Sequence, residues 1–357
     1  MDSRRSLPRI YYGAGMTKKK GGNDSDKRET MSQLRQNIIT GEWVVIATER
    51  ARRPDEYIMH VRRKIVPKKS CVFCVGTETY KNRITDIETK HIYVATNKYP
   101  AFSGCDLVEP EKSGFFFKLP GCGDHELIIT KDHDLKIANA PASLWEELLN
   151  VSQSRIKHFY SQKSIELAML IYNHGSEAGA SIQHPHAQLF GSPLLPNFVK
   201  MELRGAEHFY EKNHQCIFCE MIKSEAQNQI RVVHENAEFI SLCFYASRFP
   251  FEMWILPKDH ESNFEKIAAN QMKSFSECLS VSLKKLYKSL NNPPWNFFIH
   301  SKPPENHVSS KAYHWHMEIT PRVTRFGGFE LGGDMIINVV APEASAEFLR
   351  KTEVDHA

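Results

Sequence analysis

The segment HGSEAGASIQHPHAQ, at positions 174–188, concentrates side chains that can take part in phosphoryl chemistry. Residues two apart in an extended chain face the same side, about 7 Å from each other, so His184, His186 and Gln188 are predicted to project together. Pro185 cannot donate to a neighbouring strand, which indicates an edge or irregular end of a sheet. A neutral imidazole is a nucleophile near pH 7 that needs no activating base. We therefore predict that His186 attacks phosphorus while the amide of Gln188 donates to a phosphoryl oxygen.

The residues before these histidines form a predicted phosphate-binding loop. Gly175 and Gly179 permit close approach of the backbone, and Ser181 adds a hydroxyl group. Successive backbone N–H groups in such a loop bind anions. No Lys-Ser or Lys-Thr pair follows the second glycine, which excludes a Walker A loop. Together with His186, the loop is predicted to hold the phosphate that the imidazole attacks.

Two pairs of cysteines share one spacing, Cys71 with Cys74 in CVFC and Cys216 with Cys219 in CIFC. In a reducing compartment such pairs are metal ligands or redox dithiols, and zinc suits thiolate ligands best. The other cysteines follow no pattern and are expected to be ordinary packed thiols: Cys105, Cys122, Cys243 and Cys278.

The segments that follow the two cysteine pairs recur in the same order, which indicates an internal duplication. HELIITKDHD, LIYNHG and HPHAQ in the first half correspond to MWILPKDHE, NFFIHS and HWHME in the second. The first cysteines of the two pairs are 145 positions apart, and the histidines that end the two KDH segments are 127 apart. A repeat of this length is not a solenoid unit.

Each half therefore offers two thiolates and two imidazoles, the complete ligand set of a structural zinc ion. We predict two zinc ions per chain, and if zinc binds His184, the backbone that carries His186 is anchored as well. One zinc bound by all four cysteines is a weaker alternative, because the usual separation of such pairs is roughly 15 to 20 residues. The predicted ligands are Cys71, Cys74, His133 and His184 in the first half and Cys216, Cys219, His260 and His314 in the second.

The elements that must position these residues are predicted to be strand, strand, helix, strand and strand in each half. Apolar, β-branched runs such as 92–96, 127–130 and 297–299 indicate strands. Leucines at helical spacing in ASLWEELLNVSQSRIKHFY indicate a helix, with Ser143 and Glu146 as a capping box. An α+β fold of two duplicated units follows, each an antiparallel sheet with a packed helix.

Length and composition bound the function. The 357 residues are 41% hydrophobic and 25% charged, as in a globular protein of more than one domain. No apolar run reaches the roughly 18 residues of a membrane span, and no secretory leader is evident, so we expect a cytoplasmic protein. The surplus of basic residues lies near the start of the chain, where residues 1–36 are expected to be a disordered basic tail. We expect neither nucleic acid nor a membrane as a partner.

The blocks ITGEWVVIATERARRPDEY, NKYPA, NHGSEAGASIQHPHAQ and PKDH, with both cysteine pairs, resemble the galactose-1-phosphate uridylyltransferases of the histidine-triad superfamily from about residue 37 to 350. The resemblance implies two tandem histidine-triad-like domains, a catalytic one at 37–196 and a second at 197–350, in a homodimer whose sites are completed across the interface. It implies ping-pong transfer: His186 takes the nucleotidyl group from a nucleotide sugar, hexose 1-phosphate leaves, and a second sugar phosphate accepts the group.

The same resemblance implies roles for further residues. Two arginines approach phosphate charges, Asn97 lies in the nucleoside-binding region, and Asn173 helps to position the phosphoryl group that Ser181 and Gln188 contact. Phe329 stands where the galactose enzymes carry a sugar-binding tyrosine, and no counterpart of their glutamine is evident. The residues expected to bind substrate are Arg50, Arg53, Asn97, Asn173, Gly175, Gly179, Phe329 and Glu330.

Three functions remain open at this point. Family weight favours transfer of UMP from UDP-glucose to galactose 1-phosphate. The changes near Phe329 also suit relatives that resemble ADP-glucose phosphorylase, in which inorganic phosphate is the acceptor. A zinc-stapled protein that binds nucleotides without reaction is a third possibility, and the presence of His186 with Gln188 argues against it.

The second half departs from the first where the chemistry is expected. His316 matches His186, but Glu318 replaces Gln188, and a carboxylate repels phosphate. The second half is therefore expected to be a scaffold. Some members of the family bind their second metal with one glutamate and three histidines, for which Glu202, His300, His314 and His316 are the matching residues, although the second cysteine pair favours the cysteine set.

Overall fold

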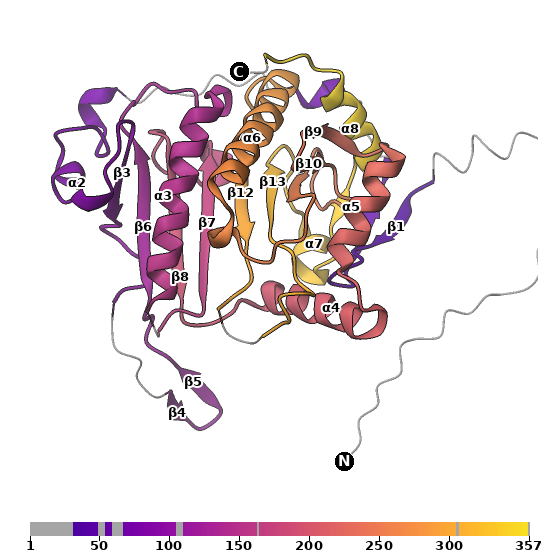
Figure 1. Ribbon diagram of the computed structural model, residues 1–357, viewed down its shortest axis with the longest axis horizontal. Helices are drawn as coiled ribbons and strands as arrows, with labels where there is room; N and C mark the ends of the chain where they lie inside the picture. The colour runs from indigo at the N-terminus through magenta and orange to yellow at the C-terminus, as the bar shows by residue number, and fades with distance from the viewer. Residues whose placement is uncertain are drawn as a thin grey trace, which may run out of the picture. The chain divides into compact units, whose positions relative to one another are not determined.

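A nine-stranded antiparallel sheet forms the centre of the structure, a computed structural model in which residues 31–48, 54–58, 67–104, 110–162, 164–304 and 307–355 are described. The sheet belongs to the unit from Ser32 to Ala357 (Figure 1). Its strands, in spatial order, are β3 (Ile92–Thr96), β6 (Asp124–Thr130), β8 (His186–Ser192), β7 (Leu167–His174), β12 (Trp295–His300), β13 (His316–Pro321), β11 (Met253–Pro257), β10 (Phe239–Leu242) and β9 (Val232–Glu235).

The sheet consists of two equivalent halves that meet at its centre. The first half contains β3, β6, α3 (Ala142–Tyr160), β7 and β8, and the second contains β10, β11, α6 (Ala269–Leu290), β12 and β13. At the junction of β7 with β12, Ile171 pairs with Phe298 and Tyr172 pairs with Phe297. A shift of 126 positions interchanges these two pairs, as an internal two-fold relation requires. The predicted α+β fold with duplicated units is confirmed.

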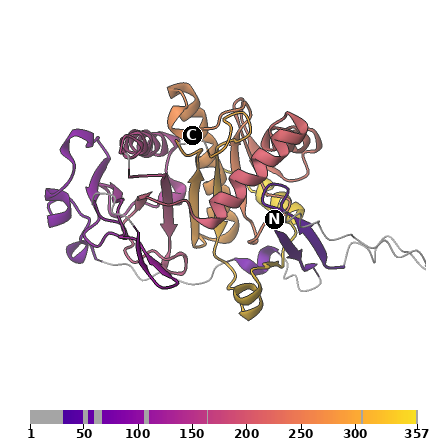
Figure 2. The same ribbon diagram turned by 90° about the horizontal axis from the view of Figure 1, so that it is seen from below.

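Helices α3 and α6 cover one face of the sheet, as the view from below shows (Figure 2). Their apolar stripes pack on every second residue of the strands, because successive side chains of a strand point to opposite faces. Helix α3 begins at Ala142 after Pro141, and no side chain caps it. Ser143 thus lies inside the first turn, so the predicted capping box is wrong.

The opposite face carries the functional side chains and a second apolar core. Helices α4 (Asn197–Asn213) and α5 (Ile217–Asn228) pack there, beside a small sheet of β1 (Gln33–Gln36), β2 (Trp43–Ile46) and β14 (Ile337–Asn338). A Cβ atom on Gly205 would lie 1.7 Å from the carbonyl oxygen of Ile39, so only glycine allows α4 to approach this sheet. The remaining elements include α2 (Glu78–Lys81), the β4–β5 hairpin (Glu111–Ser113, Phe116–Lys118), α7 (Gly328–Gly333) and α8 (Pro342–Arg350).

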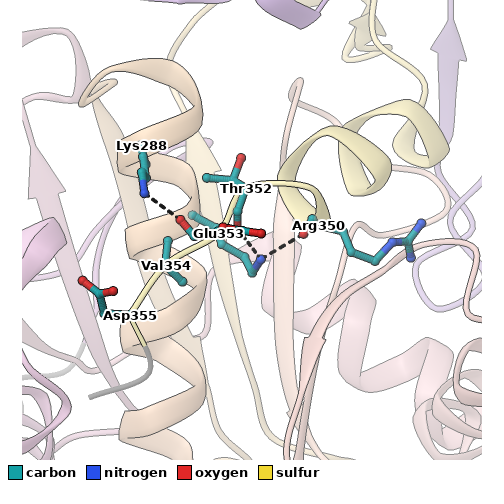
Figure 3. Close-up of a pocket in the computed structure, with 7 residues that line it drawn as sticks. Lys288, Arg350, Thr352, Glu353, Val354 and Asp355 are labelled. Carbon is teal, nitrogen blue, oxygen red and sulfur yellow. Dashed lines mark hydrogen bonds between the residues drawn. The ribbon is translucent and has the colours of Figure 1, made fainter.

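Residues 350–355 lie along α6 and border a cavity of about 450 Å³ (Figure 3). The ammonium group of Lys285 donates to the carbonyl oxygens of Arg350 and Thr352 at 3.1 and 2.7 Å, and that of Lys288 donates to the carbonyl oxygen of Glu353 at 2.8 Å. Lys285 thus satisfies the Arg350 carbonyl group at the end of α8, and both lysines hold the segment that follows this helix against α6.

Three of the cysteines outside the predicted metal sets can be compared with the structure. Cys243 and Cys278 are buried free thiols, as predicted, and burial raises the pKa of Cys278 to about 12. Cys122 is disulfide-bonded, so its prediction as a packed thiol is wrong; its sequence surroundings carry no repeated spacing that would have revealed a bridge. Cys105 lies outside the described residues. Among the described residues, no helix is long and apolar enough to cross a membrane.

Candidate active site and metal sites

The imidazole of His186 is buried at the start of β8, and its two nitrogens have different surroundings. Nδ1 lies 2.8 Å from the carbonyl oxygen of His184 and must donate its proton there, which leaves the lone pair on Nε2. The ring of Phe73, between the two cysteines of CVFC, packs edge-on at 5.0 Å. Burial lowers the pKa of His186 to about 4, so the ring is neutral at pH 7. This is the nucleophilic form of a histidine.

Gln188 is oriented by a histidine that the sequence did not single out. The backbone N–H of Ala101 donates to Nδ1 of His125 at 3.2 Å, so the proton of that ring is on Nε2, 3.0 Å from Oε1 of Gln188. The glutamine oxygen is thereby occupied as an acceptor, which turns its NH₂ group away from His125. The amide of Asn97 lies 3.2 Å from the same ring. The alternation of HELIIT was the only sequence signal for His125, which shares its strand face with buried Leu127.

The glycine loop after β7 has backbone angles that only glycine adopts readily. Gly175 and Gly179 have φ angles of 90° and 85°. The N–H groups of Ala178, Gly179 and Ala180 donate within the loop, at 3.0 to 3.1 Å, so these three are not free for an anion. Ser181 is exposed, and with Gly175 it lines a cavity of about 570 Å³. An anion in this loop could therefore be bound by the Ser181 hydroxyl group, but not by these three backbone N–H groups.

A residue of the second half fixes this loop. The side-chain amide of Asn296, in β12, donates to Oδ1 of Asn173 at 2.8 Å and to the carbonyl oxygen of Ala178 at 2.7 Å. Asn173 pairs with Asn296 across the junction of the two halves. Continuing the register of β7 with β8 by one residue places Asn173 opposite His186. The second half therefore positions the loop beside the candidate nucleophile.

The first predicted metal set is brought together beneath His186. Nδ1 of His184 lies 3.4 Å from Sγ of Cys71, 3.8 Å from Sγ of Cys74 and 3.3 Å from Nδ1 of His133. Tetrahedral zinc with its usual bond lengths separates its ligand atoms by about 3.3 to 3.8 Å. Nε2 of His184 donates to the carbonyl oxygen of Thr130 at 2.6 Å, which directs Nδ1 toward the thiolates. The residues fit a zinc ion.

The second predicted set is brought together in the same way. Sγ of Cys219 lies 3.3 Å from Nδ1 of His260 and 3.5 Å from Nδ1 of His314, and Cys216 completes the group. Nε2 of His314 lies 3.0 Å from the carbonyl oxygen of Pro257, the counterpart of the contact made by His184. The two cysteine pairs belong to separate groups, which excludes the single four-cysteine site.

A third group of possible ligands lies beside the second set. The carboxylate of Glu202 is 3.1 Å from Nδ1 of His300 and 3.1 Å from Nε2 of His316, and Glu318 closes the group. His314 lies in the cysteine group, as the favoured prediction has it, and the alternative set of one glutamate and three histidines is not brought together. The second oxygen of Glu318 contacts the guanidinium of Arg248.

Other predicted residues lie apart from His186. Glu330 accepts the N–H of Gly327 at 2.9 Å and caps α7, and Phe329 is 56% exposed on the same short helix. Figure 1 shows α7 beside the second half of the sheet, whereas β8 lies in the first half. Arg50 and Arg53 lie outside the described residues.

Comparison with known proteins gives consistent matches along the chain. Residues 23–196 match the family described as galactose-1-phosphate uridyl transferase, N-terminal domain. ADP-glucose phosphorylase of Arabidopsis thaliana is 31% identical over 347 residues, 94% of this chain and 97% of that protein. Galactose-1-phosphate uridylyltransferase of Thermotoga maritima is 28% identical, over 91% of this chain and all of that protein. The crystal structure of the Arabidopsis ADP-glucose phosphorylase with bound ADP-glucose superimposes with a TM-score of 0.75 at 28% identity, covering 90% of this chain and 100% of that chain.

Proposed function

Because the chain belongs to the galactose-1-phosphate uridylyltransferase family, we propose that it moves a nucleoside monophosphate from a nucleotide sugar to a phosphate-bearing acceptor through a covalent intermediate on His186. The observation that carries the proposal is the buried imidazole of His186, with Nδ1 bound to a carbonyl oxygen and Nε2 left as a nucleophile. A protein that merely binds nucleotides has no need of such a group.

The reaction has two displacements at one phosphorus atom. Nε2 of His186 attacks the α-phosphorus, and a P–N bond forms. The bond from the α-phosphorus to the oxygen that bridges it to the β-phosphate breaks, and the sugar 1-phosphate leaves. The acceptor oxygen then attacks the same phosphorus, and the P–N bond breaks. No proton leaves His186 in either step. Its proton stays on Nδ1, which donates to the carbonyl oxygen of His184, and this hydrogen bond stabilises the positive charge of the phosphorylated ring.

Charge that builds on the phosphoryl oxygens is met by neutral donors. The NH₂ group of Gln188 is available because His125 occupies the oxygen of the same side chain. The amide of Asn173 is held near the reacting face by Asn296. Donors that are already oriented before the reaction contribute most to such catalysis.

Two zinc ions per chain are part of the proposal. Cys71, Cys74, His133 and His184 would hold one, and Cys216, Cys219, His260 and His314 the other. A bound zinc ion with four protein ligands supplies rigidity to the fold. In the first half this rigidity concerns the segment 184–186 and therefore the position of the nucleophile.

For the nucleotide, we favour adenylyl transfer from ADP-glucose to inorganic phosphate. The full-length similarity to the Arabidopsis ADP-glucose phosphorylase, at 31% identity, supports this choice, as does phenylalanine at position 329. Uridylyl transfer from UDP-glucose to galactose 1-phosphate is the second candidate, supported by the 28% identity with the Thermotoga maritima enzyme over its whole length.

We also infer a homodimer in which α7 of one chain completes the site of the other. Phe329 and Leu331 on α7 are 56% and 76% exposed, and Phe115 in the β4–β5 hairpin is 96% exposed. These exposed apolar side chains lie on two separate elements, and a partner chain would cover them. A cytoplasmic location remains part of the proposal.

The test uses ADP-glucose and UDP-glucose, each labelled with ³²P at the α-phosphate and incubated with the protein without acceptor. The proposal predicts label on the protein that is lost in mild acid, as expected of a phosphoramidate. Release of the label by inorganic phosphate would identify a phosphorylase, and release by galactose 1-phosphate would identify a hexose-1-phosphate transferase. Absence of protein-bound label with both donors would contradict the proposal.

A further inference from the structure

A row of polar side chains crosses the functional face of the sheet from the candidate nucleophile into the second half. Asn173 in β7 pairs with Asn296 in β12, and Asn296 pairs with Thr320 in β13. His186 in β8 comes next to Asn173 on the other side when the ladder is continued by one residue. Neighbouring strands are about 4.8 Å apart, so the row spans roughly 14 Å.

A cavity of about 270 Å³ lies over the far part of this row. Asn173, Asn296 and Thr320 form its polar floor, and two arginines, Arg248 and Arg322, belong to its lining. Its volume is slightly below the range of about 300 to 1,000 Å³ for sites of drug-sized ligands. The size suits a phosphate ion or the phosphate end of a larger substrate.

The two arginines differ in whether their charge is already balanced. The guanidinium of Arg248 contacts the buried carboxylate of Glu318, so this cation has a partner. Arg322 makes no ion pair with any carboxylate in the described part of the chain, and its Nε atom is buried with no hydrogen-bond partner. A buried donor without an acceptor is destabilising, and more so when the group is charged.

Aromatic rings hold the unpaired guanidinium in place. The guanidinium carbon of Arg322 lies 5.0 Å from the centre of the Phe249 ring and 5.8 Å from that of Phe326, and these two rings stack at 5.1 Å. The backbone N–H of Arg322 donates to the carbonyl oxygen of Pro294 at 2.8 Å, which fixes the start of the side chain. Cation–π contacts restrict the guanidinium but accept none of its N–H groups.

From this geometry we infer that Arg322 forms a phosphate subsite for the part of the substrate that does not become attached to His186, and that Asn296 and Thr320 line the floor of this subsite. Arginine is suited to this ligand, because its planar N–H groups bind phosphate oxygens in pairs. The subsite holds the phosphate of a sugar 1-phosphate or inorganic phosphate, according to the acceptor. The identity of the ligand rests on the proposed function, but the anion site itself does not.

The test separates the second half-reaction from the first. Protein carrying the ³²P-nucleotidyl group is mixed with increasing inorganic phosphate or galactose 1-phosphate, and release of label is followed with the unchanged protein, Arg322→Gln and Arg322→Lys. We expect Arg322→Gln to raise the half-saturating acceptor concentration about 10- to 100-fold with a smaller change in the maximal rate, and Arg322→Lys to recover part of the loss. The acceptor whose half-saturating concentration shifts, inorganic phosphate or galactose 1-phosphate, is the ligand of the subsite.

Arg204→Gln is the matched control, because Arg204 is exposed on α4. Unchanged acceptor dependence in Arg322→Gln would overturn the inference. If no nucleotidyl protein forms at all, the proposed function fails, and calorimetric titration of the free protein with inorganic phosphate decides the subsite alone. Binding that is lost in Arg322→Gln and kept in Arg204→Gln supports it; equal binding in both, or no binding to the unchanged protein, overturns it.

Discussion

The two halves of the molecule place a histidine in the same frame and give it different neighbours. Nδ1 of His186 lies 2.8 Å from the carbonyl oxygen of His184, and Nδ1 of His316 lies 3.1 Å from that of His314. The phenylalanine between the cysteines packs on each ring, with centroids 5.0 Å apart in the first half and 5.2 Å in the second. The backbone and the metal set therefore do not distinguish the halves.

The difference lies in the charges around the imidazole. Burial lowers the pKa of His186 to about 4, and an uncharged glutamine follows two positions later. Burial also acts to lower the pKa of His316, but the carboxylates of Glu202 and Glu318 outweigh it and raise that pKa to about 10. The same backbone and the same kind of metal-ligand set therefore surround both histidines. Only His186, which has no carboxylate beside it, is a neutral nucleophile at pH 7.

The largest expected effect comes from removing the imidazole in one half or the other. His186→Gly should reduce nucleotidyl transfer about 10⁴-fold or more, because no other group can form the P–N bond. His316→Asn should leave labelling of His186 intact and lower the unfolding temperature, because Glu202 loses a buried partner. Single-turnover rates and thermal unfolding of both variants measure the contrast. An equal loss of transfer in both variants would contradict the assignment of the nucleophile to the first half alone.

Gln188→Glu gives the first half the neighbour of the second. We expect kcat to fall about 10²- to 10³-fold, because a carboxylate replaces an oriented donor where negative charge builds up. The reciprocal change Glu318→Gln should alter kcat less than threefold and should lower the unfolding temperature, because Arg248 loses its carboxylate. Steady-state kinetics of the two variants checks this. A larger loss of kcat in Glu318→Gln than in Gln188→Glu would speak against the comparison.

Substituting one metal ligand in each half should distinguish a site that positions the nucleophile from a site that only stabilises the fold. Cys71→Ser and Cys216→Ser should each lower the zinc content by about one ion per chain. Cys71→Ser should also reduce kcat about 10- to 100-fold, because His184 supplies both a ligand and the carbonyl oxygen that orients His186. Cys216→Ser should lower the unfolding temperature with a smaller loss of kcat. Metal analysis and kinetics on the same preparations measure both effects, and a greater loss of kcat in Cys216→Ser would contradict the assignment.

The smallest expected effect concerns the contact between the halves. Asn296→Ala should reduce kcat about tenfold, because the glycine loop loses the donor that holds Asn173 and the carbonyl oxygen of Ala178. Asn228→Ala, at the exposed end of α5, removes an amide that bonds only locally and serves as the control. Rates that are equal in the two variants would show that the second half does not position the loop.

The sequence predicted what depends on local spacing and on repetition. Residues two apart in an extended segment share a face, so the common orientation of His184 and His186 could be predicted from the sequence. A repeated cysteine pair implies a repeated ligand set, so both metal groups could be predicted as well. The order of strands and helices followed from apolar patterns in the same way. The predicted capping box is wrong because the N-cap residue is Pro141, so the helix begins two residues earlier than a box at Ser143 and Glu146 requires.

What the sequence did not predict depends on cross-strand register. His125 and Gln188 are 63 positions apart and meet only because β6 pairs with β8. The contact of Asn296 with the glycine loop requires β7 to pair with β12 at the junction, which no local pattern specifies. Arg322 could not be identified either, since only its surroundings reveal that it lacks a carboxylate partner among the described residues.

The central claim is that the nucleotidyl group becomes bonded to Nε2 of His186 during turnover. Protein quenched in alkali after milliseconds with ADP-glucose or UDP-glucose should gain the mass of one nucleoside monophosphate, and peptide mapping should place it on the segment 184–188 at His186. The segment that contains His316 should be unmodified. Product formed at the full rate with no such adduct, or with the adduct on another residue, would contradict the account.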